Sequence, residues 1–209
     1  MNGYSSVKRT SMFWDGISAF YDLFEISYNR KVIEGTAAIC ASLMDREDKV
    51  LECACGTGLI TVSTAPLTKS YIATDFSSKM LSKCKKKMSS SENVLFEHAD
   101  ITSLKYNDDT FDKVIAGNVI HLLDDPKKAL DELKRVTKPG GMLIIPTYLT
   151  GVDKAHKGLV GTFNKMGANF KRTFDMEEYK EFFANMGFNK VEYITAEGRM
   201  PCSVAVIRL

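Results

Sequence analysis

The chain of 209 residues carries 28 basic and 26 acidic side chains, for a formal charge of +2, and 44% of its residues are hydrophobic. This length suits one domain with a sizeable core, and the near balance of charge offers no field to hold a nucleic-acid backbone. No apolar run approaches the roughly 18–20 residues of a membrane span, and the first residues lack the apolar core of a secretory signal. We therefore expect a cytoplasmic protein that does not act on nucleic acid.

The five cysteines are odd in number and scattered, which fits a reducing compartment better than a disulfide framework. Cys53 and Cys55 are close enough in sequence to suggest a metal site. A structural zinc site usually needs two such ligand pairs, and only distant cysteines and histidines could complete one. We expect no metal and interpret the pair as small fillers of a tight turn.

In chain order, residues 11–44 predict two aromatic-rich helices. A strand ending at Glu52, a turn through Cys53 to Gly58 and a helix from Leu59 follow, after which strand-like and helix-like blocks alternate. Ser77 and Asp125 are the expected N-caps of two of these helices. The later strands are expected at 70–74, 93–99, 111–120, 138–148, 189–196 and 202–209, and the later helices at 77–88, 125–136 and 175–187.

This alternation predicts an α/β fold, a doubly wound, mostly parallel sheet of seven strands with N-terminal helices and a lid insertion. We expect residues 1–209 to form a single domain. Its expected parts are a helical cap (1–45), a core (46–146), the lid insertion (147–174) and a C-terminal helix with a strand pair (175–209).

The turn reads "CACGTG" and is neither a phosphate-binding P-loop nor a three-glycine dinucleotide fingerprint, because Thr61 stands where the third glycine would be. Ligands of parallel sheets bind at the carboxyl ends of the strands. Asp75, about twenty residues after the loop, is placed there to accept hydrogen bonds from two ribose hydroxyls, although a helix-terminal charge is an alternative. Asp100 could accept from an adenine amino group, with Ile101 against the ring. These residues favour a nucleoside ligand.

Five blocks in order extend this interpretation: "VLECACGTG", "ATDFSSKML", "HADI", "FDKVIAGNVIHLLDDP" and "RVTKPGGMLII". Over about residues 46–146 the chain resembles the class I S-adenosylmethionine-dependent methyltransferases. More narrowly, "FYDLF" and "NVIHLLDDP" are similar to the branch that includes ubiquinone and menaquinone C-methyltransferases and other small-molecule methyltransferases. The resemblance implies S-adenosyl-L-methionine as cofactor and S-adenosyl-L-homocysteine as product.

The resemblance also implies roles for particular residues. Glu52 would anchor the loop and the ammonium side of the cofactor, and Asn118 would contribute backbone near it. Tyr21 would close over the methionine end, although a core position on its helix is an equal alternative. The remaining expected cofactor contacts are the loop residues Cys53, Ala54, Gly56 and Gly58, the ribose acid Asp75, the adenine contacts Asp100 and Ile101, and the flanking Phe76 and Met80.

Ala54 departs from the family pattern, which usually has glycine at this position. An alanine there costs much if its φ is positive and little if φ is negative. The sequence leaves that sign open.

Methyl transfer from a sulfonium needs two positioned reactants and no covalent enzyme intermediate. His121 is the candidate base or substrate-orienting group, with a packed or capping histidine as the alternative. Segment 147–172 contains apolar residues including Phe163 and Phe170, which favours a small apolar or aromatic methyl acceptor. The Asp/Asn-Pro-Pro signature of DNA amino-methyltransferases is absent.

Alternatives stay open: an inactive S-adenosylmethionine-binding module, a nicotinamide-dependent oxidoreductase on the same plan, or a methyltransferase of phospholipids or quinone precursors at a membrane surface. The insertion is basic and apolar, which would suit an anionic surface. Gly158, Gly161 and Gly167 should weaken a continuous helix there by about 1 kcal/mol each. We therefore expect a mobile lid and no stable membrane insertion. The oligomeric state is not predicted.

Overall fold

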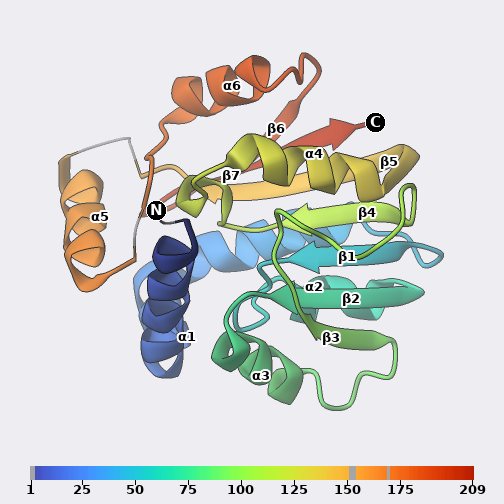
Figure 1. The fold of residues 1–209 in the computed structure, drawn as a ribbon, viewed down its shortest axis with the longest axis horizontal. Helices are drawn as coiled ribbons and strands as arrows, with labels where there is room; N and C mark the ends of the chain where they lie inside the picture. The colour runs from blue at the N-terminus through green and yellow to red at the C-terminus, as the bar shows by residue number, and fades with distance from the viewer. Residues whose placement is uncertain (1–2, 151–153, 169) are drawn as a thin grey trace.

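The computed structural model describes the backbone of residues 3–150, 154–168 and 170–209, and the side chains of residues 13–16, 27–150, 158, 160–168 and 170–209. One sheet has the strand order β3-β2-β1-β4-β5-β7-β6 (Figure 1). Strands β1 to β5 pair in parallel, and β7 is antiparallel to both β5 and β6. The bounds are β1 Lys49–Cys53, β2 Ser70–Asp75, β3 Val94–His98, β4 Phe111–Ala116, β5 Thr137–Tyr148, β6 Glu192–Ala196 and β7 Cys202–Arg208. This confirms the predicted fold class.

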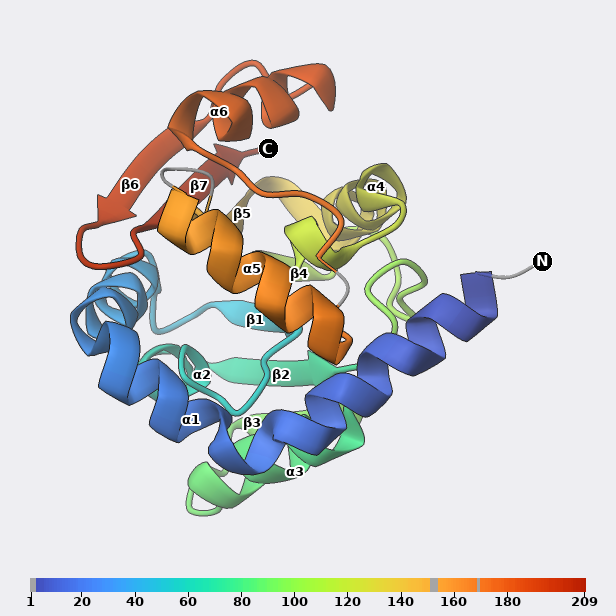
Figure 2. The ribbon, with the colours of Figure 1, turned by 90° about the vertical axis from the view of Figure 1, so that its left-hand side faces the viewer.

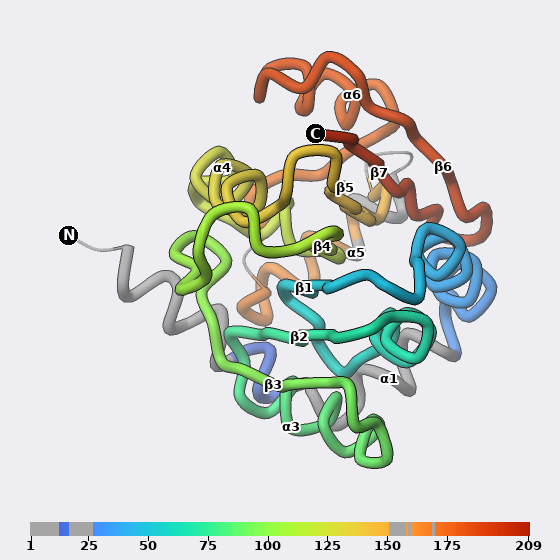
Figure 3. The backbone as a smooth tube through the Cα atoms, turned by 90° about the vertical axis from the view of Figure 1, so that its right-hand side faces the viewer, coloured from blue at the N-terminus to red at the C-terminus, as the bar shows by residue number. Residues whose placement is uncertain are grey.

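Helices cover both faces of the sheet. Helices α4 (Pro126–Val136) and α6 (Met176–Asn185) pack on one face, in a cluster that includes Leu51 and Cys53 of β1. The second half of α1 (Gly3–Ser42), with α2 (Thr61–Thr64) and α3 (Ser78–Lys87), covers the other, which includes Val50 (Figure 3). Alternate residues of β1 face the two opposite helix layers, and both sets of residues are buried. The strand therefore appears in the sequence as a continuous apolar run.

The predicted caps are confirmed. The side chain of Ser77 accepts a hydrogen bond from Met80 N, and that of Asp125 accepts one from Lys128 N. A capping box at Asp175 begins α6. Each cap satisfies backbone donors that the first turn of a helix leaves unpaired.

The two predicted N-terminal helices form one element, α1, which is interrupted by non-helical backbone at Asn29 (φ −140°, ψ 27°). The Asn29 side chain fixes this break: its Nδ2 donates to Met200 O at 2.8 Å, and its Oδ1 accepts from Met200 N at 3.2 Å. The first half of α1 and α5 (Lys154–Met166) lie across the carboxyl ends of the parallel strands (Figure 2). Among the described residues no helix is both long and apolar enough to cross a membrane.

Two element predictions differ from the structure, and one helix was not predicted. The helix expected from Leu59 is only the four residues of α2, and Pro66 in the following 3-10 turn η1 (Ala65–Leu67) prevents its continuation. The strand expected over 111–120 ends at Ala116, because Asn118 takes a left-handed conformation (φ 51°) and its N–H bonds to Pro146 O at 2.8 Å.

Helix α5 is continuous through Gly158 and Gly161 and ends at Met166, directly before Gly167, whose φ is 109°. Val160 is buried, and Phe13 of α1 lies 3.6 Å from the position of a Cβ on Gly167. The mobility of this segment as a lid stays a prediction.

Candidate functional site

The loop after β1 turns through three left-handed residues, Ala54 (φ 55°), Gly56 (φ 56°) and Gly58 (φ 89°). Its backbone is tied to β2 by a hydrogen bond from Cys55 N to Thr74 O at 2.9 Å. At Gly58 a Cβ would lie 2.8 Å from Cys84 Sγ of α3, so only glycine lets the loop approach that helix. The loop therefore has a fixed shape at the carboxyl end of β1.

The positive φ of Ala54 answers the question that the sequence leaves open. A non-glycine residue in this region costs roughly 1–2 kcal/mol, of which about 0.4–1 kcal/mol is returned because alanine restricts the unfolded chain. We expect Ala54→Gly to stabilise the protein by up to about 1 kcal/mol, a rise of a few degrees in Tm measured by calorimetry. The matched control Ala38→Gly, at an exposed helical position, should destabilise by about 1 kcal/mol. A fall in Tm for both variants would contradict strain at Ala54.

Glu52 is almost fully buried, with 1% of its surface exposed. Its Oε2 accepts hydrogen bonds from Thr61 Oγ1 at 2.5 Å and from Tyr71 Oη at 2.9 Å. Thr61, which breaks the dinucleotide fingerprint, therefore joins α2 to the end of β1. Burial raises the pKa of the Glu52 carboxyl from 4.5 to about 7, although both hydroxyl bonds act in the opposite direction.

This raised pKa predicts a pH dependence of folding. Between pH 4.5 and about 7 the folded protein holds a proton on Glu52 that the unfolded chain has released, so stability falls as pH rises through this window. The difference between the folded and unfolded pKa values corresponds to a loss of folding stability on the order of 3 kcal/mol. Glu52→Gln should remove that slope, measured by urea unfolding at pH 5 and pH 8. An unchanged slope would assign the pH dependence to other groups.

Asp75 joins the loop to α3. Its Oδ2 accepts from Gly56 N at 2.8 Å and its Oδ1 from Ser77 N at 2.7 Å. Each oxygen keeps a lone pair, so the two structural bonds leave room for two ligand hydroxyls. Sequence reasoning missed Asp15 of α1, which accepts from Ser77 Oγ at 2.5 Å and so holds the first half of α1 against this edge. No local signal could show a contact between residues 62 positions apart.

The other predicted ring contacts lie next to Asp75. Phe76 directly follows it and is 37% exposed, whereas Met80 is buried on α3. Ile101 is buried after β3, and Asp100 Oδ1 accepts from Thr102 N and Oγ1, each at 2.8 Å. The structure thus brings Asp75, Phe76 and Met80 together, and places Asp100 and Ile101 at the end of the adjacent strand.

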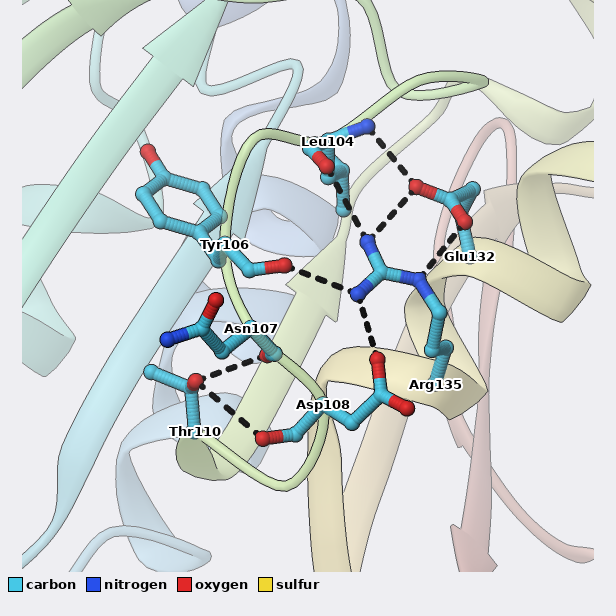
Figure 4. Close-up of polar contacts among 7 residues, drawn as sticks. All are labelled: Leu104, Tyr106, Asn107, Asp108, Thr110, Glu132 and Arg135. Atoms are coloured by element: carbon cyan, nitrogen blue, oxygen red, sulfur yellow. Dashed lines mark hydrogen bonds and ion pairs between the residues drawn. The ribbon is translucent and has the colours of Figure 1, made fainter.

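The segment after Asp100 is held by one arginine. Nε, Nη1 and Nη2 of Arg135 all donate, to Glu132, Asp108, Tyr106 O and Leu104 O, at 2.8–3.0 Å (Figure 4). Glu132 in turn accepts from Leu104 N at 2.8 Å. This cluster fixes the connection from β3 to β4, on which Asp100 and Ile101 lie.

Asn118 and His121 follow β4. The Asn118 side chain accepts from Tyr148 N at 3.0 Å and so ties the end of β4 to β5. His121 is buried in the 3-10 turn η2 (Ile120–Leu122), and its ring stacks on that of Phe170 with centroids 5.0 Å apart. Burial, with a contribution from nearby Arg172, lowers the pKa of His121 from 6.5 to about 3, so the imidazole is neutral.

Cys53 and Cys55 point into different core clusters on opposite faces of the sheet. The described part of the chain contains no group of three or more histidine, cysteine or acidic residues that could hold a metal ion. The side chain of Tyr21 lies outside the described residues.

The strand order with an antiparallel seventh strand, the glycine loop and the acid at the end of β2 together define the class I methyltransferase architecture. The sequence pattern of a Methyltransferase domain matches residues 51–145. The demethylmenaquinone methyltransferase of Staphylococcus aureus is 31% identical over 165 residues, which cover 68% of each chain. That of Clavibacter sepedonicus is 32% identical over 144 residues, and the match spans only 59% of its length. The chain belongs to the S-adenosylmethionine-dependent methyltransferase family that includes these relatives.

Solved structures have the same fold. An N-methyltransferase of Bradyrhizobium japonicum in complex with S-adenosyl-L-homocysteine aligns with a TM-score of 0.73 and 16% identity, over 96% of this chain and 98% of that one. A possible histamine N-methyltransferase of Thermotoga maritima aligns with a TM-score of 0.71 and 22% identity, over 93% and 97% of the two chains. These neighbours show the shared fold, and membership of the family makes the protein a methyltransferase that uses S-adenosylmethionine.

Proposed function

We propose that the protein methylates a small aromatic or apolar molecule by in-line displacement. The observation that carries the proposal is the hydrogen bond from Gly56 N to Asp75 Oδ2, which joins the loop after β1 to the acid proposed to hold the ribose. The first half of α1 and α5 lie across this edge of the sheet (Figure 2). When bound, S-adenosylmethionine supplies an electrophilic methyl group. The named relatives are demethylmenaquinone methyltransferases, which favours an acceptor of the quinone-precursor class.

The residues present fit this cofactor. The left-handed turn of Ala54, Gly56 and Gly58 would let backbone approach the methionine part, and Cys53 begins that turn. Asp75 would hold the ribose, and the exposed Phe76 and buried Met80 would flank the nucleoside. Asp100 and Ile101 would contact adenine. Glu52 would anchor the loop, Asn118 would fix the backbone after β4, and Tyr21 would cover the methionine end.

The neutral His121 would orient the acceptor rather than act as a strong base, because an imidazole whose pKa is about 3 takes up a proton poorly at pH 7. The side chains around it would exclude water and position the acceptor, which is the main protein contribution to such a transfer.

Calorimetric titration with S-adenosyl-L-homocysteine tests the cofactor site, and no binding at millimolar ligand would overturn the proposal. Labelled methyl transfer to a panel of hydroxylated aromatics, quinone precursors and phospholipids tests the acceptor. Cofactor binding without transfer to any of them would favour the inactive binding module. Transfer only to phospholipids, or only with vesicles present, would favour action at a membrane surface.

A further inference from the structure

The segment after α5 is bound tightly to the turn that follows β4. Lys171 N and Arg172 N both donate to His121 O, at 2.9 and 3.4 Å, and Nη1 of Arg172 donates to Ile120 O at 2.7 Å. The ring of Phe170 stacks on His121 with an interplanar angle of 9°. These contacts bring two basic residues of the insertion to the carboxyl end of β4, the strand that pairs with β1.

Arg172 and Lys171 differ in their partners. Lys171 Nζ forms an ion pair with Asp124 at 2.6 Å. Among the described residues, Arg172 forms no ion pair, and its side chain has the single hydrogen bond to Ile120 O although it is partly buried. Arg135, by contrast, uses all three guanidinium nitrogens (Figure 4). The acid whose charge acts on Arg172 is Asp124, which is already paired with Lys171. A partly desolvated guanidinium without an ion pair of its own favours an anion from outside the chain.

The neighbouring histidine supplies a second unsatisfied group. Nδ1 of His121 is buried and has no hydrogen-bond partner. Buried polar atoms normally have partners, so an orphan at the carboxyl edge of a parallel sheet indicates a ligand contact. Because the imidazole is neutral, it can share a hydrogen bond with an anion held by Arg172 without competing for its charge.

We infer that Arg172 binds the methyl acceptor through an ionised hydroxyl, a phenolate or enolate oxygen, and that His121 orients the same oxygen. This rests on the proposed function and assigns its acceptor a chemical class. On binding, the O–H bond breaks, the oxygen keeps the electron pair and the proton passes to water. The guanidinium thus makes the acceptor nucleophilic by stabilising its anion, and no strongly basic side chain is needed.

The probe is 1-naphthol, with 1-methoxynaphthalene as the analogue that cannot ionise. Both are titrated into protein saturated with S-adenosyl-L-homocysteine, and the absorbance of bound 1-naphthol is followed against pH to read its ionisation. The wild type should bind 1-naphthol at least 10-fold more tightly than the methyl ether at pH 8 and should lower the pKa of the bound hydroxyl. The charged group that acts on Arg172 is Asp124, which is paired with Lys171, and the neutral His121 lies beside Arg172.

Arg172→Gln should weaken 1-naphthol binding about 10- to 100-fold, leave the methyl ether unchanged and return the hydroxyl to its solution pKa. Arg172→Lys should restore part of both effects because it keeps the charge. The matched control Lys171→Gln removes the adjacent charge and should change binding less than twofold.

Unchanged ionisation of the probe in Arg172→Gln, an equal loss in Lys171→Gln, or no preference of the wild type for 1-naphthol would each overturn the inference. Binding of S-adenosyl-L-homocysteine by Arg172→Gln shows that the variant is folded. It also separates failure of this inference from failure of the proposed function, which would require that the wild type does not bind S-adenosyl-L-homocysteine.

Discussion

Replacing Asp75 with alanine should weaken binding of S-adenosyl-L-homocysteine at least 100-fold, measured by calorimetry. The variant removes a charged acceptor proposed to bind two ribose hydroxyls, and hydrogen bonds to charged groups contribute roughly 1.5–3 kcal/mol each. It also leaves the N–H groups of Gly56 and Ser77 without their acceptor, which loosens the loop. Both effects lower affinity, so the experiment must separate them.

Two controls make that separation. Ser77→Ala removes the cap on Met80 N and the contact with Asp15 but leaves the carboxylate, so it should cost about 1 kcal/mol of stability and little affinity. The 2′-deoxy analogue of S-adenosyl-L-homocysteine should bind the wild type at least 10-fold more weakly than its parent, whereas Asp75→Ala should not distinguish the two. Equal losses in Asp75→Ala and Ser77→Ala, with discrimination retained, would show that Asp75 acts only as a helix-terminal charge.

Local patterns in the sequence predicted the parts of the site that local chemistry determines. The caps at Ser77 and Asp125 follow from side chains that satisfy nearby backbone donors, and the strands follow from continuous apolar runs between turn residues. The loop was recognisable by its glycines. The sign of φ at Ala54 was not predictable, since it depends on how β1 and α3 hold the turn.

Contacts between distant residues left no such pattern. The bonds of Glu52 to Tyr71 and of Asp15 to Ser77 depend on how the layers pack, and neither pair has a characteristic spacing. In the sequence, Arg172 is one of several basic residues of the insertion. Only the fold shows that it contacts His121 and Ile120. Helix α5 was not predicted, because Gly158 and Gly161 lower the helix propensity of its sequence.

Arg135→Ala should be the most destabilising of the substitutions considered, at about 3 kcal/mol, or roughly 6–12 °C in Tm for a chain of this length. The change removes the guanidinium donors to Leu104 O, Tyr106 O and Asp108, and leaves Glu132 without its charged partner (Figure 4). Calorimetry at pH 7 measures the loss. Because Asp100 lies just before this segment, affinity for S-adenosyl-L-homocysteine should also fall, though less than in Asp75→Ala.

Two substitutions in the same helix are its controls. Lys127→Ala breaks the exposed pair with Asp131, at 2.7 Å, and should cost at most about 0.5 kcal/mol. Arg135→Lys keeps a positive charge near Glu132 but cannot donate in three directions from one plane, so it should recover less than half of the lost stability. If Arg135→Ala melted at the same temperature as Lys127→Ala, the cluster would be an exposed ion pair of little energetic weight, and the connection carrying Asp100 would be held by its apolar contacts, chiefly the buried Ile101 and Leu104.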